Sequence, residues 1–216
     1  MILNPRFYMP LNLDRSTERI RLGLRPDLPT GLVLFGGQGS MDMVKIARAL
    51  NNPGVQLILL CGRNETVAQR LRALPRRTPM FVGGFTNDIP YYMALADFFI
   101  GKAGPGSVSE ALAMRLPVIV ERNAWTLPQE RYNADWIQEQ QVGVVLRNFS
   151  EIAEAVRELL KPETLGSYRG KAAGIRNSAV YEIPELLHKI LSDSTELSAL
   201  QSYSPTPKHS PIELFH

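Results

Sequence analysis

The feature that most constrains the fold of this chain is a regular alternation of short apolar runs with helical patterns. The apolar runs are bounded by glycine, proline or asparagine, as strands are, and they cover Gly31–Gly36, Val55–Cys61, Pro79–Val82, Asp97–Gly101, Pro117–Glu121 and Val142–Leu146. The helical patterns, in which apolar residues recur every three or four positions, cover Met43–Leu50, Thr66–Leu74, Ile89–Leu95, Ser107–Met114 and Arg131–Gln140. Such alternation predicts an α/β fold, a Rossmann-like parallel sheet with helices on both faces.

The two ends of the chain depart from this alternation. A short helical pattern, Ser16–Leu24, precedes the first strand. After the last strand only helical patterns remain, and they cover Glu151–Leu160, Tyr168–Ile175 and Ile183–Leu191. From Ser192 onward Ser, Pro and Thr accumulate without apolar periodicity, which predicts a flexible tail over residues 192–216.

The composition of the chain limits which folds and which partners are possible. A chain of 216 residues with 44% hydrophobic content can form one large domain with its own core. The formal net charge of +3 is compatible with an anionic partner and equally with an ordinary solvated surface. Cys61 ends an apolar run, so we expect it to be buried and without a disulfide, as is typical of a reducing cytoplasm.

The sequence also bears on membranes. The first residues lack the pattern of a secretory signal, and no apolar run approaches the roughly 18 residues that a membrane-spanning helix needs. We therefore expect a cytoplasmic protein whose association with a membrane, if any, is peripheral.

A glycine-rich loop follows the first strand and contains Gly37, Gln38 and Ser40. Glycines allow close backbone approach, so the N–H groups of this loop could bind a diphosphate. A tight turn without a ligand explains the same residues. The spacing matches neither a Walker loop nor the dinucleotide fingerprint.

The third strand is followed by a second such loop, with Gly84, Phe85 and Thr86 ahead of a helix. Asn87 or Asp88 is suited to cap that helix, and Pro90 suits its first turn. Capping alone and contact with a ligand both remain open here.

The fourth strand runs into a sharp turn formed by Ala103, Gly104, Pro105 and Gly106, after which a helix is expected from Ser107. The free N–H groups and the positive end of the dipole at such a helix start favour an anion. Ser107 and Glu110 also have the spacing of a capping box, which needs no ligand.

The fifth strand is followed by a loop containing Trp125 and by a helix start with Gln129, Glu130 and Asn133. Amides and a carboxylate on one helical turn suit sugar hydroxyls, which need paired donors and acceptors. An ordinary polar helix start is the alternative.

No metal site or cofactor is expected from the sequence. There is no Asp-x-Asp motif, the cysteine is single, and the histidines are His188, His209 and His216, all near the C-terminus. Lys102, Arg63 and the helix N-termini would then balance the charge of a bound anion.

Three stretches, GGFTND, KAGPGSVSEALAMRLPVIVE and PQERYNA, resemble a known family. They are similar to the donor-binding half of GT-B glycosyltransferases, in the branch with monogalactosyldiacylglycerol synthases and the N-acetylglucosaminyltransferase that makes lipid II; the galactolipid type is closer. The resemblance implies the C-terminal half of a GT-B fold that binds a UDP-sugar. It places Phe85 beside the uracil, Glu110 on the ribose, and Gln129, Glu130 and Asn133 on the hexose.

In that family a second α/β domain precedes this region and holds the acceptor and the general base. The resemblance therefore implies an interdomain linker and short helix over residues 1–25, a donor-binding domain over 26–191, and the tail over 192–216. It also implies an inverting, metal-independent hexosyltransferase acting on a lipid such as diacylglycerol, with no nucleic-acid partner. By itself this chain would bind the donor but catalyse almost no sugar transfer.

Two other functions stay open. The chain could be the donor subunit of a split glycosyltransferase that docks on a separate acceptor subunit. A sugar-nucleotide 2-epimerase of similar fold has less support, because such enzymes keep a histidine in the cleft and here the histidines lie near the C-terminus.

Overall fold

The structure is a computed structural model that describes residues 2–52 and 54–201 of the chain. These residues form two compact units, one up to Asn177 and one from Ser178 onward. The first unit contains the sheet and the candidate site. The second unit consists, in its described part, of helix α9 (Ala179–Gln201).

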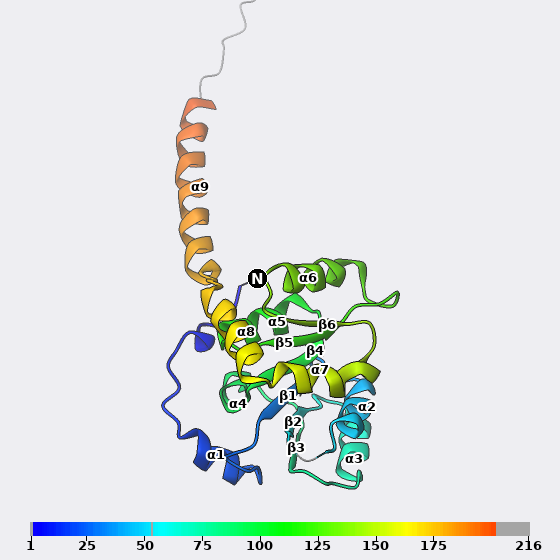
Figure 1. The fold of residues 1–216 in the computed structure, drawn as a ribbon. Coiled ribbons are helices and arrows are strands. Elements are labelled where there is room, and N and C mark those ends of the chain that lie inside the picture. The colour runs from blue at the N-terminus through cyan, green and yellow to red at the C-terminus, as the bar shows by residue number, and fades with distance from the viewer. Residues whose placement is uncertain (1, 53, 202–216) are drawn as a thin grey trace, which may run out of the picture. The chain divides into compact units, whose positions relative to one another are not determined.

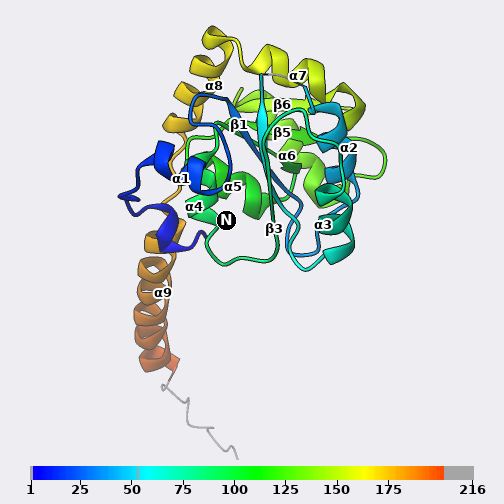
Figure 2. The same ribbon diagram turned by 90° about the horizontal axis from the view of Figure 1, so that it is seen from below.

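Six strands among the described residues form one parallel sheet in the order β3-β2-β1-β4-β5-β6 (Figures 1 and 2). The strands are β1 (Thr30–Leu34), β2 (Gln56–Leu60), β3 (Met80–Gly83), β4 (Phe98–Lys102), β5 (Val118–Glu121) and β6 (Gly143–Leu146). The predicted Rossmann-like sheet is confirmed. Because β1 and β4 are neighbours, the loops after them diverge to opposite sides, which is where ligands bind in such sheets.

The helices agree with the sequence pattern to within a few residues at most ends. They are η1 (Pro5–Phe7), α1 (Arg15–Arg21), α2 (Asp42–Ala49), α3 (Glu65–Arg72), α4 (Ile89–Leu95), α5 (Pro105–Ala113), α6 (Pro128–Glu139), η2 (Phe149–Glu151), α7 (Ile152–Leu159) and α8 (Pro162–Gly174). Helix α9 continues to Gln201, past residue 192, where the sequence pattern predicts a tail. Residues 202–216 of that predicted tail lie outside the described residues.

Two hydrophobic cores lie on the two faces of the sheet, because successive side chains of a strand point to opposite faces. Val33 of β1 belongs to the core beneath α2, α3 and α7. Its neighbours Leu32 and Leu34 belong to the core that includes residues of α4, α5 and α6. Both faces are therefore covered, as the nearly uniform apolar strands predict.

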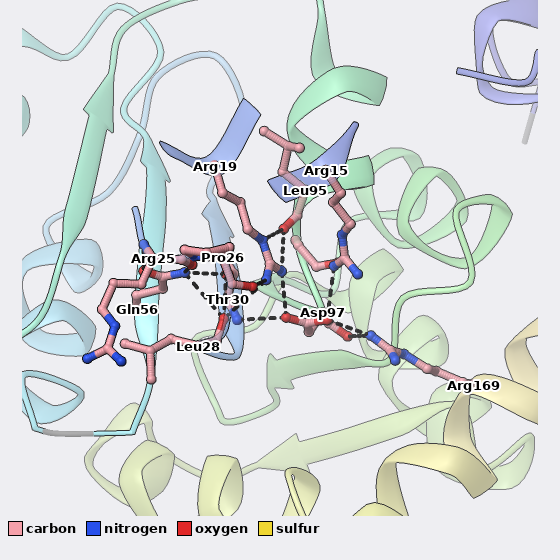
Figure 3. Close-up of polar contacts among 11 residues, drawn as sticks. Arg15, Arg19, Arg25, Pro26, Leu28, Thr30, Gln56, Leu95, Asp97 and Arg169 are labelled. Atoms are coloured by element: carbon pink, nitrogen blue, oxygen red, sulfur yellow. Dashed lines mark hydrogen bonds and ion pairs between the residues drawn. The ribbon is translucent and has the colours of Figure 1, made fainter. Parts of the chain in front are cut away.

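A partly buried polar cluster ties two helices to the amino ends of β1 and β4 (Figure 3). The carboxylate of Asp97 accepts hydrogen bonds from the Thr30 N–H at 2.8 Å and from Arg19 at 2.7 Å. Arg15 of α1 and Arg169 of α8 each reach its other oxygen at 2.9 Å. Burial alone would raise the pKa of Asp97, but Arg15, the Thr30 N–H and Arg19 together hold it below its ordinary value.

The segment ahead of β1 is packed onto the same unit. Phe7 and Leu24 are buried in the core shared with α4 and α5. The side chain of Gln56 in β2 accepts from the Arg25 N–H at 2.8 Å and donates to the Arg25 carbonyl at 2.6 Å. The segment predicted as a linker is thus attached to the domain near both of its ends. No helix in the part of the chain that the structure describes is long and apolar enough to cross a membrane.

Candidate functional site

A pocket of about 260 Å³, here called the first pocket, opens at the carboxyl ends of β1, β2, β3 and β4. It is lined by Leu34, Gly36, Gly37, Leu60, Gly62, Gly84, Phe85, Thr86, Ile89, Gly106, Ser107 and Glu110. Three of the loops that the sequence singles out meet here, since the carboxyl ends of parallel strands share one edge of the sheet.

The glycine-rich loop after β1 is fixed by the loop after β2. Gly62 has a φ of +60°, and a Cβ placed on it would lie 2.3 Å from the carbonyl oxygen of Gly37, so only glycine fits. The Arg63 N–H donates to that same carbonyl at 2.9 Å. Asn64 donates from Nδ2 to the Gln38 carbonyl at 3.0 Å. Because hydrogen bonds fix the carbonyls of Gly37 and Gln38, the shape of the glycine-rich loop does not depend on a ligand.

Several N–H groups around the first pocket have no acceptor among the described residues. Those of Gly37 and Gln38 take part in no hydrogen bond there. In α5 the first helical bond runs from the Val108 N–H to the Gly104 carbonyl at 3.1 Å, which leaves Gly106 and Ser107 with free N–H groups. The positive end of the α5 dipole lies at the same place.

Glu110 contributes a carboxylate to the first pocket and has no hydrogen bond or ion pair among the described residues. Burial raises its pKa above the ordinary glutamate value. The capping-box interpretation of Ser107 and Glu110 is wrong, because α5 begins at Pro105 with Gly104 at the N-cap and no side-chain cap. The missing N–H of Pro105 and its fixed φ suit it to that first position. The carboxylate of Glu110 is therefore unused by the fold.

Phe85 lies at the mouth of the first pocket with 51% of its surface exposed. The Arg63 guanidinium carbon lies 4.4 Å from the centre of the Phe85 ring. Asp88 stands at the N-cap of α4 as predicted, but its side chain caps nothing and instead pairs with Arg6 at 2.6 Å. Thr86 accepts the Asp88 N–H at 3.0 Å. These contacts hold the loop that presents Phe85.

A second pocket of about 430 Å³ opens at the carboxyl ends of β4 and β5. It is lined by Phe35, Asp42, Lys102, Ala103, Glu121, Asn123, Trp125, Thr126, Leu127, Glu130 and Phe149. Trp125 stands at this pocket with 92% of its surface exposed. Phe35 is followed directly by glycines that line the first pocket, so the two pockets are adjacent along one rim.

Two of the predicted sugar-binding residues are engaged inside the protein. Glu130 has a side chain only 9% exposed and pairs with the Lys102 ammonium at 2.8 Å. Asn133 donates from Nδ2 to the Ala103 carbonyl at 2.8 Å. Gln129 is exposed and lines neither pocket. Of the three, Glu130 alone lines the second pocket.

The predicted nucleotide-binding residues are distributed unevenly. Those that line the first pocket are Gly37, Gly84, Phe85, Thr86, Gly106, Ser107 and Glu110. Ala103 lines the second pocket, while Gln38, Ser40 and Gly104 line neither. The Ser40 hydroxyl is used locally, since it accepts from the Asp42 N–H at 3.1 Å and donates to the Asp42 carboxylate at 3.0 Å.

Sequence reasoning missed four polar residues of the second pocket: Asp42, Glu121, Asn123 and Thr126. Glu121 is the last residue of β5 and Asn123 lies two positions beyond it. A polar residue at the carboxyl end of a predicted parallel strand is a rim position, and this signal was available in the sequence.

The structure also bears on thiol and metal chemistry. Cys61 is buried and free, as predicted, and burial raises the pKa of its thiol to about 11. Within residues 2–52 and 54–201, no group of three or more His, Cys, Asp or Glu side chains is arranged to hold a metal ion.

Comparison with known proteins identifies the family. Residues 32–187 match the glycosyltransferase family 28 C-terminal domain, and the chain belongs to that family. It is 32% identical over 220 residues to the probable monogalactosyldiacylglycerol synthase 3 of Oryza sativa subsp. japonica, a match covering 94% of this chain and 43% of that protein. It is 32% identical over 192 residues to the monogalactosyldiacylglycerol synthase of Spinacia oleracea, covering 85% and 36%. The chain spans less than half the length of these relatives.

Solved structures share the fold. MurG of Acinetobacter baumannii superposes with a TM-score of 0.65 at 18% identity, over 81% of this chain and 53% of that one. HepE of Anabaena, solved in complex with UDP-glucose, superposes with a TM-score of 0.64 at 18% identity, over 88% of this chain and 56% of that one. The predicted half of a GT-B fold is confirmed by these neighbours.

Proposed function

We propose that this chain binds the donor of a hexosyltransferase, a UDP-sugar, at the carboxyl ends of its strands. The observation that carries the proposal is the first pocket, where the unpaired carboxylate of Glu110 and the free N–H groups of Gly106 and Ser107 line one cavity. A carboxylate accepts hydrogen bonds from two neighbouring ribose hydroxyls, and N–H groups at a helix start bind phosphate. Membership of the family and the UDP-glucose in the HepE structure support the same ligand.

In this arrangement the uracil lies beside Phe85 and the ribose on Glu110. The diphosphate lies between the glycine-rich loop and the start of α5, near the half-exposed ammonium of Lys102. An ammonium has three donors, so Lys102 keeps protons for a phosphate while it pairs with Glu130. The hexose then extends into the second pocket, where Glu130 is a wall residue and Gln129 and Asn133 remain predicted contacts.

The proposed reaction is an inverting displacement at C1 of the hexose. The acceptor hydroxyl oxygen forms a bond to C1 as the bond from C1 to the β-phosphate oxygen breaks, and UDP leaves with that electron pair. The hydroxyl proton passes to a base. This chain contributes the fixed donors that stabilise the charge growing on the diphosphate, and we propose that they do so without a metal ion.

We propose a lipid such as diacylglycerol as the acceptor, since the relatives are named monogalactosyldiacylglycerol synthases. Acceptor and base would be held by polypeptide equivalent to the remainder of those relatives, and contact with a membrane would be peripheral. The transferred sugar would be galactose or glucose.

Calorimetric titration of the chain with UDP tests the proposal. We expect saturable heat and an upward shift of the melting temperature with UDP, and a weaker response to ADP, which has the same diphosphate and a different base. A folded sample that gives neither heat nor thermal shift with millimolar UDP would refute nucleotide binding. Equal responses to UDP and ADP would show that the first pocket does not select uracil over adenine.

A further inference from the structure

The second pocket holds more negative charge than its cations compensate. Asp42, Glu121 and Glu130 line it, against a single lining cation, Lys102. Glu130 pairs with Lys102 at 2.8 Å. Asp42 pairs with Lys45, a residue outside the lining, at 2.8 Å. Glu121 has no ion pair among the described residues.

The carboxylate of Glu121 is held in place by a neutral group. It accepts a hydrogen bond from Asn123 Nδ2. Burial raises its pKa, and the charge of Asp42 adds to that rise, although the Phe149 N–H, Lys45 and Asn123 act in the opposite direction. A carboxylate offers about four acceptor positions, so this bond leaves part of its capacity free toward the pocket.

The charge of Glu121 is not required by these contacts. An amide oxygen of the same shape would accept the hydrogen bond from Asn123, and the β5 backbone pairs with β4 and β6 regardless of this side chain. A partly buried carboxylate without a cation costs stability, because the charged form is poorly solvated. Such a group on the wall of a pocket is suited to a ligand that donates hydrogen bonds and carries no negative charge of its own.

We propose that Glu121 binds a hydroxyl of the transferred sugar, and that the second pocket therefore accepts an uncharged hexose and rejects a uronic acid. The carboxylate of a uronic acid would enter a pocket whose walls hold three carboxylates and one ammonium. Like charges at close range are unfavourable, and this exclusion needs no steric difference between the sugars. The inference rests on the proposed function, because it takes the second pocket as the sugar site.

The test is calorimetric titration of the full chain with UDP, UDP-galactose, UDP-glucose and UDP-glucuronate. UDP-glucose and UDP-glucuronate differ only at C6, so their affinity ratio measures the charge effect. For the natural chain we expect at least about tenfold weaker binding of UDP-glucuronate than of UDP-glucose, a difference of about 1.4 kcal/mol. For Glu121→Gln we expect unchanged UDP affinity and a ratio about threefold to tenfold smaller.

Two further variants test whether the effect comes from Glu121 at the pocket or from the net charge of the protein. Glu139→Gln removes an exposed carboxylate at the end of α6, outside both pockets, and should leave every affinity unchanged. Asn123→Ala removes one group that holds Glu121 and should reproduce part of the Glu121→Gln effect. It keeps the proposal testable if Glu121→Gln folds poorly.

The outcomes are distinct. If Glu121→Gln and Asn123→Ala keep the natural ratio of UDP-glucose to UDP-glucuronate affinity, the proposal is overturned. If Glu121→Gln weakens UDP itself in parallel, Glu121 acts on the nucleotide and the proposal is also overturned. If the natural chain binds no UDP, the proposed function fails first and this inference falls with it. A natural chain that binds UDP but shows no preference between the two sugar nucleotides refutes this inference alone.

Discussion

Two carboxylates at opposite ends of the same sheet show how differently one fold treats a buried charge. At the amino ends of β1 and β4, Asp97 accepts hydrogen bonds from the Thr30 N–H and three guanidinium groups, and its pKa is lowered (Figure 3). At the carboxyl ends, Glu110 has no partner among the described residues, and burial raises its pKa. The difference indicates that Asp97 stabilises the fold, whereas Glu110 is left available to a ligand.

The largest expected effect is on stability, at Asp97. Asp97→Asn leaves the buried Arg19 without its carboxylate, so we expect a loss of about 3–5 kcal/mol in the free energy of unfolding. Urea denaturation measures it. The matched control is Asp27→Asn, which breaks an exposed 2.6 Å pair with Arg25 and should cost less than about 1 kcal/mol. Equal losses in the two variants would contradict the structural role of Asp97.

The next effect is on binding, at Glu110. Glu110→Gln should weaken UDP binding by about 1–3 kcal/mol, the cost of a lost charge-assisted hydrogen bond. The melting temperature should not fall, because a neutral amide is less costly to bury than an unpaired carboxylate. Calorimetry and a melting curve on the same sample measure both. Unchanged affinity with a lower melting temperature would show that Glu110 serves the fold.

A smaller effect is expected on the pH dependence of stability, where the two carboxylates give opposite slopes. The pKa of Asp97 is lowered by folding, so its contribution is present above the unfolded value, about 3.9, and is lost as pH falls through the folded pKa. The pKa of Glu110 is raised by folding, so stability declines as pH rises from about 4.3 through that raised pKa.

Urea midpoints measured between about pH 2 and pH 7 test these slopes. The loss of stability on acidification should be shallower in Asp97→Asn than in the natural chain. The decline in stability as pH rises above about 4 should be smaller in Glu110→Gln than in the natural chain. Identical profiles in the natural chain and both variants would contradict the assigned pKa directions.

The smallest effect is expected at the Arg6–Asp88 pair. Its 2.6 Å separation is as short as the 2.7 Å between Arg19 and Asp97, but its side chains are 50% and 48% exposed, against 7% and 14%. The burial of an ion pair, and not its distance, should set its contribution to stability. Arg6→Ala should therefore lower the free energy of unfolding, measured by urea denaturation, by about 0–1 kcal/mol. A loss as large as that of Asp97→Asn would show that short distance alone sets the contribution.

The sheet and most helices could be predicted because they depend on local periodicity. The mostly apolar β1, β2 and β4 and the three-to-four spacing in α2 and α3 are each visible within one short window. The start of α5 was misplaced because Ser107 and Glu110 match a capping box, whereas Pro105 in fact occupies the first turn.

The positions of the pocket loops could be predicted because they depend on chain position at the end of a strand. The loops around Gly37, Phe85 and Gly106 lie on the first pocket, as expected from strand ends alone. The pairing of Glu130 with Lys102 joins residues 28 positions apart, and Arg15 lies 82 positions from Asp97. Residue type and spacing do not determine which distant partner a charged side chain meets, so these contacts required the structure.

If the hexose binds in the second pocket as proposed, the exposed indole of Trp125 would report its binding by fluorescence. In water an indole emits at long wavelength, and a hexose packed against Trp125 in the second pocket would shift that emission toward the blue. A nucleotide without a sugar would occupy the first pocket and leave the spectrum unchanged. Trp136, the other tryptophan, is partly buried and supplies a constant background. Under the proposed function, sugar occupancy could then be followed separately from nucleotide occupancy, in real time and without a label.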